Sequence, residues 1–515
     1  MRTLPIVILG MLWTASPALA FDCTALTGTT VPKSAIGFPT SGAVVETASF
    51  VNDPKIGAFC KLTGGIKPID PAAPDIKFQV NLPEHWNGKL LHFGGSGLNG
   101  TVITGEQLRA KDPAKLQPIA QGYVTFGSDS GHKGRGGSFA LNAEAFANFQ
   151  GAQLKKTHDT AQELVRRVFH AKPQRTYFLG GSEGGREALI VAERWPGDYD
   201  GVVSIFPAYD ISALGTTFVQ AGQQIFGKPG AWVSPAKLSH VSAKVLATCD
   251  ALDGLKDGII GDVKACRAAF DIASLRCPGG ADAGTDCLSD AQLAGLGVLV
   301  GPRKLGVTLS GIDTVAAWPV LESDTTPGTT VFGSIDDVGK SAAGGLGSDQ
   351  ICFMVLQDAN CDFMHFDPAA HADRLKQLSR EMDVQGVLGP FRKRGGKLLL
   401  VAGSSDMTIP PGNTVAYYER LKTAYGTALP RFARFYMIPG MAHGGGRGNF
   451  EPGADLLGAV DAWVTKNRAP GLQITTDTNV ATVGRTRPLC EYPTYPKYKG
   501  SGDANRAESF TCAMP

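Results

Sequence analysis

The chain has no long hydrophobic run beyond its first residues and no marked excess of charge of either sign. A membrane-spanning helix needs roughly 20 consecutive apolar residues, so we expect no membrane anchor. The net charge of the 515 residues is only +2, and basic and acidic residues are interspersed. Because nucleic-acid-binding proteins concentrate positive charge, we expect no nucleic acid as a partner. A small neutral or weakly charged molecule fits this composition better, and the sequence makes no prediction of oligomeric state.

The ten cysteines include no CxxC pair, the spacing typical of zinc sites and redox motifs. The first residues form the pattern of a secretory signal peptide, with Arg2, an apolar run at residues 6–12, and the small-residue exit Ala18-Leu19-Ala20. We therefore expect residues 1–20 to be removed and the mature protein to be secreted or periplasmic. Thiols oxidise in those compartments. Close spacing then favours four disulfides: Cys249 with Cys266, Cys277 with Cys287, Cys352 with Cys361, and Cys490 with Cys512.

Short apolar segments alternate with amphipathic ones in two parts of the chain, a pattern that favours an α/β fold with a parallel sheet covered on both faces. Strands are predicted at residues 89–93, 123–126, 175–179, 397–402 and 434–438, and helices at residues 157–170, 186–194 and 414–423. Between the two parts the alternation stops and glycine increases. The predicted organisation is a signal peptide (1–20), a core in two parts (21–210 and 386–515) and an inserted domain (211–385).

A candidate nucleophile lies in a glycine-rich turn between a predicted strand and a predicted helix. Residues 180–184 contain G-x-S-x-G with Ser182 at its centre, which in this context is typical of a nucleophile elbow. Glycines leave room for the sharp turn, and the N-terminus of the helix favours negative charge that develops nearby. The alternative is an ordinary glycine-rich turn between a strand and a helix.

A serine nucleophile needs a base and a carboxylate that orients the base. Asp406 and His443 follow the predicted strands 397–402 and 434–438, in the chain order Ser, Asp, His. The carboxyl ends of such strands are where open α/β sheets build their sites. A single histidine is more often an ordinary surface or core residue, but His443 is the only one of nine histidines after Asp406.

Acyl transfer also needs hydrogen-bond donors for the oxyanion. The backbone N–H groups of Glu183 and of Gly97, in the turn at residues 94–100, are the candidates. The same turn spells G-x-G-x-x-G, so a nucleotide-dependent oxidoreductase is an alternative. It is less favoured, because a dinucleotide site needs an acidic residue about 20 positions further on, where residues 118–121 are Pro-Ile-Ala-Gln.

Taken together, these motifs resemble the tannase and feruloyl esterase family, which includes the monohydroxyethyl-terephthalate hydrolases. The matching stretches lie at residues 86–88, 94–100, 180–186, 199–201, 249–260, 439–441, 487–490 and 498–503. The resemblance implies an α/β-hydrolase fold, a doubly wound, mostly parallel sheet with a large inserted lid domain. It also implies a triad of Ser182, Asp406 and His443 that cleaves esters of aromatic acids, of feruloyl or galloyl type, through an acyl-enzyme. The alternatives are a terephthalate half-ester hydrolase and, in a different class, a non-catalytic calcium-dependent protein that binds aromatic esters.

Residues 249–260 look like the calcium loop of this family. The resemblance implies a structural Ca²⁺ in the lid, held by the side chains of Asp250, Asp253 and Asp257 and by the carbonyl oxygens of Leu255 and Ile259. Carboxylate and carbonyl oxygens are the ligands that Ca²⁺ prefers, although the spacing is not that of an EF-hand. The alternative is a solvated acidic loop.

Two departures from the family pattern concern the bridge near the triad and the lid. Many members carry a disulfide beneath the triad, where this chain has Gly181 and Gly444. The resemblance then implies a bridge between Cys23 and Cys60, and leaves the 352–361 bridge as an additional one.

Terephthalate-ester members use a lid arginine, whereas Lys340 is the only lysine or arginine in residues 305–373. Four aromatic side chains of the lid are candidate pocket walls, although core packing is the more common role: Trp318, Phe332, Phe353 and Phe363.

Overall fold

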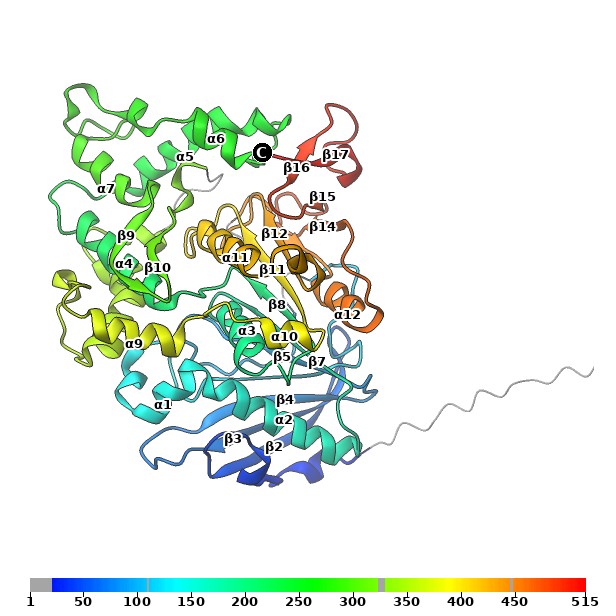
Figure 1. Ribbon diagram of the computed structural model, residues 1–515. Helices are drawn as coiled ribbons and strands as arrows, with labels where there is room; N and C mark the ends of the chain where they lie inside the picture. The colour runs from blue at the N-terminus through cyan, green and yellow to red at the C-terminus, as the bar shows by residue number, and fades with distance from the viewer. Residues whose placement is uncertain (1–20, 109–110, 323–328, 445–447) are drawn as a thin grey trace, which may run out of the picture.

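The computed structural model describes residues 21–108, 111–322, 329–444 and 448–515. The predicted signal peptide lies outside these described residues. A ten-stranded sheet runs through the molecule (Figure 1). In spatial order its strands are β1 (Thr30–Val31), β2 (Gly42–Asp53), β3 (Gly57–Lys67), β4 (Ile76–Pro83), β6 (Val124–Ser128), β5 (Lys89–Phe93), β7 (Arg175–Gly181), β8 (Gly201–Ile205), β11 (Lys397–Gly403) and β12 (Ala433–Ile438).

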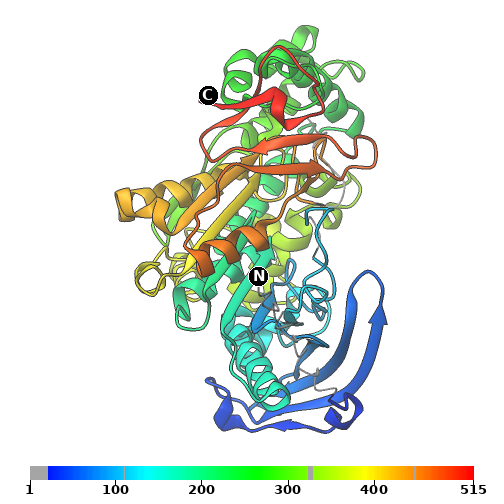
Figure 2. The same cartoon turned by 90° about the vertical axis from the view of Figure 1, so that its right-hand side faces the viewer.

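The sheet has an antiparallel half and a parallel half. Neighbouring strands from β1 to β6 pair antiparallel, whereas β6, β5, β7, β8, β11 and β12 pair parallel in that order. The five predicted strands all belong to the parallel half and are confirmed within two residues. The antiparallel half, which forms the blue end of the molecule in Figure 2, was not predicted.

Both faces of the parallel half are buried, as the apolar strands predict. In β11, Leu398 and Leu400 point to one face and Leu399 and Val401 to the other, because successive side chains of a strand alternate. The first face packs on helices α3, α10 and α11, and the second on α12. The helices of this core are α1 (Ala143–Ala147), α2 (Gln153–Phe169), α3 (Glu183–Arg194), α10 (Gly389–Lys393), α11 (Pro411–Tyr425) and α12 (Leu456–Lys466).

Strands β8 and β11 are neighbours in the sheet although residues 206–396 lie between them in the chain. The described part of this segment adds no strand to the large sheet and supplies most residues of two hydrophobic clusters, each of which it shares with residues of the core. In Figure 1 most of this segment lies to the left of strands β8, β11 and β12. Apart from α10, its elements are α4 (Ile211–Ile225), α5 (Pro235–Cys249), α6 (Val263–Ala269), α7 (Asp290–Val300), β9 (Arg303–Leu309), β10 (Ile312–Val315), α8 (Thr329–Phe332) and α9 (Ala372–Met382).

Five disulfides pair all ten cysteines: Cys23–Cys60, Cys249–Cys266, Cys277–Cys287, Cys352–Cys361 and Cys490–Cys512. They include the four pairs expected from spacing and the one implied by the family resemblance. The last bridge ties together the C-terminal strands, which form two small sheets at the red end of Figure 2. These strands are β13 (Pro452–Gly453), β14 (Gln473–Asp477), β15 (Thr486–Leu489), β16 (Tyr495–Tyr498) and β17 (Phe510–Ala513).

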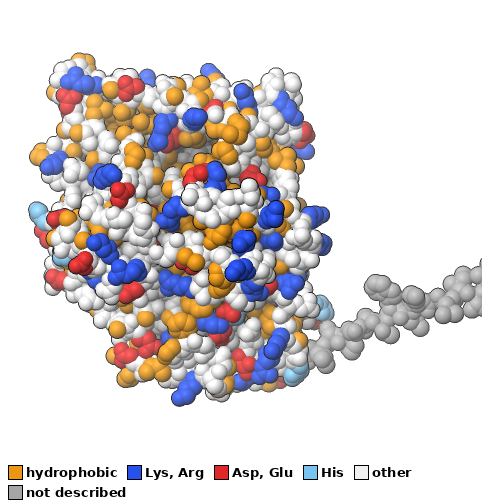
Figure 3. Space-filling model, viewed as in Figure 1, with side chains coloured by type: hydrophobic (Ala, Val, Ile, Leu, Met, Phe, Trp, Pro, Cys, Tyr) orange, Lys and Arg blue, Asp and Glu red, His pale blue; other side chains and the backbone are white. Residues whose placement is uncertain are grey.

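The outer surface agrees with the composition. On the face shown in Figure 3, basic and acidic side chains are scattered among apolar ones. No helix in the described part of the chain combines the length and the apolar character that crossing a membrane requires.

We expect Leu400→Ala to lower the free energy of unfolding by about 2–5 kcal/mol, because it opens a cavity at a fully buried position of the central sheet. Leu472→Ala is the matched control, since Leu472 is 69% exposed, and its effect should stay within about 0.5 kcal/mol. Urea unfolding followed by circular dichroism measures both variants. Equal effects of the two substitutions would contradict the placement of β11 in the core.

Candidate active site

Ser182 stands at the junction of β7 and α3 with a strained backbone. Its φ is +61° and its ψ is −120°, a region that non-glycine residues seldom adopt. Its N–H donates to the carbonyl of Ile205 at 3.0 Å. A Cβ on Gly180 would collide with the backbone of Gly184, so the turn depends on glycine. The helix begins at Glu183, three residues earlier than predicted, so its N-terminus lies directly behind the serine.

The structure brings Ser182, His443 and Asp406 into one hydrogen-bonded chain. His443 Nδ1 lies 2.7 Å from Asp406 Oδ2, and His443 Nε2 lies 2.9 Å from Ser182 Oγ. Because the buried Asp406 carboxylate accepts from Nδ1–H, Nε2 is left as the acceptor for the serine hydroxyl. The other carboxylate oxygen, Oδ1, accepts from the N–H groups of Thr408 and Ile409, both at 2.8 Å. The carboxylate is therefore fixed in both position and direction.

The parallel register explains why three residues distant in sequence meet. They follow β7, β11 and β12, whose carboxyl ends share one edge of the sheet. The loops after β11 and β12 are also tied to each other. Gly440 N–H donates to Ser404 Oγ and Ser405 N–H to the carbonyl of Met441, each at 3.0 Å.

Phe206 lies against Gly181, one of the two glycines at the positions where the family resemblance implies bridged cysteines in many members. Its ring centroid lies 4.5 Å from that of His443, and a Cβ on Gly181 would lie 2.8 Å from its ring. Gly444 has a φ of +78°, which a cysteine would adopt only with strain. The contact between Phe206 and His443 was not predicted from the sequence. Its position directly after β8, at the same edge of the sheet, is the signal that could have revealed it.

The two predicted oxyanion donors belong to residues that line one cavity together with Ser182. Glu183 is the first residue of α3, where backbone N–H groups have no acceptor inside the helix. Gly97 lies in the turn after β5, opposite the start of α3. No helix occurs between β5 and β6 in the described residues, so this turn lacks the helix that a dinucleotide-binding loop requires.

The cavity beside Ser182 is open to solvent, and the empty space of about 430 Å³ within it includes part of that solvent. Its lining residues are Gly97, Leu98, Ser182, Glu183, Ala208, Ile211, Leu214, Gly215, Phe218, Leu346, Gln350, Thr408 and Ile409. No lysine, arginine or histidine is among these described lining residues. Most of one wall comes from α4 in the inserted segment.

The four aromatic residues considered as pocket walls do not line this cavity. Trp318 and Phe332 are buried in one hydrophobic cluster of the inserted segment, and Phe353 and Phe363 pack against another. Phe218 of α4 is the aromatic side chain that the cavity does present. Lys340 is largely exposed and pairs with Asp337 at 3.3 Å.

The Glu183 side chain is turned away from the solvent and paired with a fully buried guanidinium. Arg186 Nε donates to Glu183 Oε1 at 2.9 Å, and Nη2 donates to the same oxygen. Arg186 also donates to the carbonyl oxygens of Met382 at 2.7 Å and Phe149 at 3.1 Å. These contacts lock the first turn of α3 to the inserted segment and to the region before α2.

The predicted calcium loop is compact and its carboxylates are partly used by its own backbone. Asp250 accepts from the N–H groups of Asp257 and Gly258, and Asp253 from those of Leu255 and Gly261, at 3.0–3.1 Å. Burial raises the pKa of Asp253 to about 7, and the charges of Asp257 and Asp250 add to the rise. A bound cation would relieve this repulsion, so the donor set suits a Ca²⁺ ion. Arg487 pairs with the Asp257 carboxylate, which leaves that residue less available.

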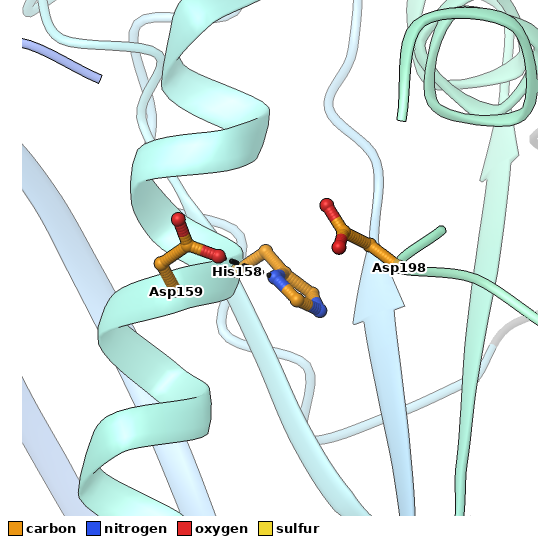
Figure 4. Close-up of side chains that lie close together, drawn as sticks. All are labelled: His158, Asp159 and Asp198. Carbon is orange, nitrogen blue, oxygen red and sulfur yellow. Dashed lines mark hydrogen bonds and ion pairs between the residues drawn. The ribbon is translucent and has the colours of Figure 1, made fainter. Parts of the chain in front are cut away.

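A second group of potential ligands was not predicted. His158, Asp159 and Asp198 are the group in the described ranges whose ligand atoms all lie within 4.8 Å of one another (Figure 4). The Lys155 ammonium lies 2.8 Å from Asp159 and 2.9 Å from Asp198. Because this internal cation already pairs with both carboxylates, the group is explained as a buried ion-pair network. The three aspartates of the predicted calcium loop are spread more widely than this group.

Comparison with known proteins extends the similarity over nearly the whole chain. Residues 60–513 match the family described as tannase and feruloyl esterase. An uncharacterised esterase of Agrobacterium fabrum is 36% identical over 95% of this chain and 93% of its own length. The mono(2-hydroxyethyl) terephthalate hydrolase of Piscinibacter sakaiensis is 32% identical over 89% of this chain and 84% of its own. The crystal structure of feruloyl esterase B from Aspergillus oryzae has a TM-score of 0.76 at 25% identity, covering 92% of this chain and 98% of that one.

We expect Glu183→Gln to lower the free energy of unfolding by about 3–5 kcal/mol, because it leaves the buried Arg186 charge without its partner. Glu163→Gln is the matched control, since Glu163 pairs with Arg166 at the same spacing but Arg166 is half exposed. That change should cost less than about 1 kcal/mol. Chemical unfolding at pH 7 measures the difference, and similar costs for the two variants would contradict the burial of the Glu183 pair.

Proposed function

This chain belongs to the tannase and feruloyl esterase family and is a carboxylic ester hydrolase, and we propose that it cleaves aromatic-acid esters through Ser182. The observation that carries this proposal is the hydrogen-bonded chain of Ser182, His443 and Asp406 at a cavity without charged basic groups. The mostly apolar lining of this cavity suits an aromatic acyl group better than a charged one.

In the proposed reaction, the Ser182 hydroxyl transfers its proton to His443 Nε2 while its oxygen attacks the ester carbonyl. The N–H groups of Glu183 and Gly97 stabilise the oxyanion of the tetrahedral intermediate. His443 then gives its proton to the leaving alcohol, and the C–O ester bond breaks to leave an acyl-enzyme. Water repeats the sequence, which releases the carboxylic acid and restores the serine. Asp406 keeps Nδ1 protonated throughout.

The neutral cavity favours esters of hydroxycinnamic or gallic acid over a terephthalate half-ester. A free carboxylate in an apolar cavity needs a paired cation, and the described lining supplies none. The half-ester stays the second candidate because a relative with 32% identity is a mono(2-hydroxyethyl) terephthalate hydrolase. We also propose that the inserted segment acts as the lid, since α4 and residues 346 and 350 form a wall of the cavity.

We propose that the protein is exported and that its lid contains a structural Ca²⁺. Export to an oxidising compartment is supported by the five disulfides, which use all ten cysteines. The signal-peptide pattern of residues 1–20 supports export through a secretory pathway. Asp250, Asp253 and Asp257, with the carbonyls of Leu255 and Ile259, would hold the ion. Its charge would offset the repulsion among buried carboxylates, and no step of ester hydrolysis involves it.

We expect wild-type protein to react with a fluorophosphonate probe at Ser182 and to hydrolyse methyl ferulate, chlorogenate or a gallate ester. Ser182→Ala should lose the labelling and at least about 10⁴-fold in kcat, with an unchanged melting temperature. A panel with mono(2-hydroxyethyl) terephthalate compares the two substrate classes by kcat/KM. A higher value for the half-ester would reject our substrate class. Binding of esters by wild-type protein without labelling or turnover would favour the non-catalytic alternative.

We expect removal of calcium with a chelator to lower the melting temperature and its return to restore it, because an ion that binds only the folded state stabilises that state. A free calcium concentration of about 100 times Kd should raise the free energy of unfolding by about 2.7 kcal/mol. Asp253→Asn should abolish this calcium dependence, whereas Asp286→Asn, an exposed aspartate of the same segment, should keep it. A melting temperature that calcium leaves unchanged, together with no metal found by elemental analysis, would reject the calcium site.

A further inference from the structure

Glu187 is a fully buried carboxylate one turn into α3, beneath residues 94–100, which we call the oxyanion loop. Its Oε2 accepts from the backbone N–H of Gly95 at 2.7 Å. Its Oε1 accepts from Asn99 Nδ2 at 2.8 Å and from Gln153 Nε2 at 2.9 Å. Two of the three donors therefore belong to the loop that carries Gly97. The reaction proposed above gives Glu187 no chemical role.

The amide groups around Glu187 are oriented by the carboxylate. Gln153 Oε1 accepts from the hydroxyl of Ser128 at 2.7 Å, which turns its NH₂ group toward Glu187. Asn99 Nδ2 also donates to Ser130 Oγ. A rotated Asn99 amide would place its oxygen against the carboxylate. Because the Glu187 side chain receives only donors in the described structure, an ionised carboxylate matches this pocket, and a neutral amide would set one donor against another.

The oxyanion loop needs such an anchor because its backbone is strained. Leu98 has a φ of +48° and Asn99 a φ of +22°, values that cost free energy for residues other than glycine. A Cβ on Gly95 would collide with the Asn99 side chain, so the loop folds tightly over that side chain. Gly184 N–H donates to the carbonyl of Gly95 at 3.0 Å. The loop is therefore held against α3 on both sides of Gly95, once by the helix backbone and once by Glu187.

We propose that Glu187 is a positioning residue for ester hydrolysis, whose carboxylate holds Gly95 and Asn99 so that Gly97 N–H points at the oxyanion above Ser182. This inference rests on the proposed function. An error of about 1 Å in the position of an oxyanion donor can cost about 100-fold in rate. Glu187 does not touch the reacting atoms and acts only through the oxyanion loop.

Glu187→Gln tests the role of the charged acceptor at nearly unchanged side-chain volume. We expect kcat for a ferulate or gallate ester to fall by about 10–100-fold with KM changed less than about twofold, because the oxyanion is bound only in the transition state. Burial raises the pKa of Glu187 to about 7, so assays at about pH 8.5 keep the wild-type carboxylate ionised.

Glu193→Gln is the control on the same helix. Glu193 accepts from the N–H groups of Gln385 and Gly386 and has no contact with the oxyanion loop. It should lose stability but keep the wild-type kcat. A matching loss of kcat in this control would overturn the inference, because the effect would then follow from weakening α3 in general.

Exchanging the acid and amide groups between positions 187 and 99 should restore part of the lost kcat, a recovery that a purely structural role would not produce. In the double variant Asn99→Asp with Glu187→Gln, the new amide at position 187 can donate to the carboxylate introduced at position 99 and still accept from Gly95. Gln153 keeps its two hydrogen bonds if its amide turns, so that its oxygen faces position 187 and its NH₂ group donates to the Ser128 hydroxyl. We expect the pair to regain at least about fivefold in kcat over Glu187→Gln alone. Absence of recovery, or a wild-type kcat in Glu187→Gln, would overturn the inference.

Asn99→Gly provides the test if Glu187→Gln fails to fold. Glycine accepts the positive φ of this position. The substitution removes one of the two loop donors to Glu187 and keeps the other, the N–H of Gly95, so we again expect lower kcat at similar KM. Wild-type kcat in this variant would overturn the inference. Wild-type protein that neither hydrolyses esters nor labels at Ser182 would overturn the proposed function and this inference with it, whereas active wild type with unaffected variants overturns the inference alone.

Discussion

The 2.9 Å hydrogen bond between the Ser182 hydroxyl and His443 Nε2 sets the main constraint on this structure. To reach it, the backbone must turn at Ser182 with a φ of +61°, which requires glycines on both sides of the turn. It also requires β7 and β12 to be held by β8 and β11, the strands between them, in one parallel register. Disruption of any of these pairings would move the imidazole away from the hydroxyl.

Buried charge lies directly behind this arrangement. Glu183 and Glu187 flank Arg186 in the first turns of α3, and each has its hydrogen-bonding groups matched. Buried ion pairs contribute little net stability, because desolvation offsets the attraction between the charges. Their effect here is geometric. Each contact fixes α3 against a different neighbour: the inserted segment, the chain before α2, and the loop after β5.

The sheet and the inserted segment divide the site between them. The sheet carries Ser182, Asp406 and His443 just beyond the carboxyl ends of β7, β11 and β12, whereas α4 and its neighbours supply cavity wall. This chain is similar over most of its length to proteins named feruloyl esterase B and mono(2-hydroxyethyl) terephthalate hydrolase. In the reaction proposed above, the reacting groups belong to the core, and much of the cavity wall belongs to the insertion.

Local patterns determined much of this protein by themselves. The strands of the parallel half are continuous apolar runs, and the G-x-S-x-G turn, Asp406 and His443 each follow such a run, so the candidate triad could be predicted from order and position. Close cysteine spacing predicted four of the five bridges, because short loops leave few other partners. The antiparallel strands before β5 were not predicted. β2 and β3 pair with each other across a short turn, but both mix apolar residues with polar ones and glycine, so neither forms a continuous apolar run.

Tertiary structure alone decided the residues that act through space. Phe206 beside His443, Lys155 between Asp159 and Asp198, and Glu187 beneath the oxyanion loop belong to no sequence motif. The cavity walls also could not be assigned, and the four aromatic residues considered for them pack in the core, because an aromatic side chain looks the same in sequence whether it faces a core or a pocket. Sequence period specifies which face of an element is apolar, but only the packing of the elements decides what that face meets.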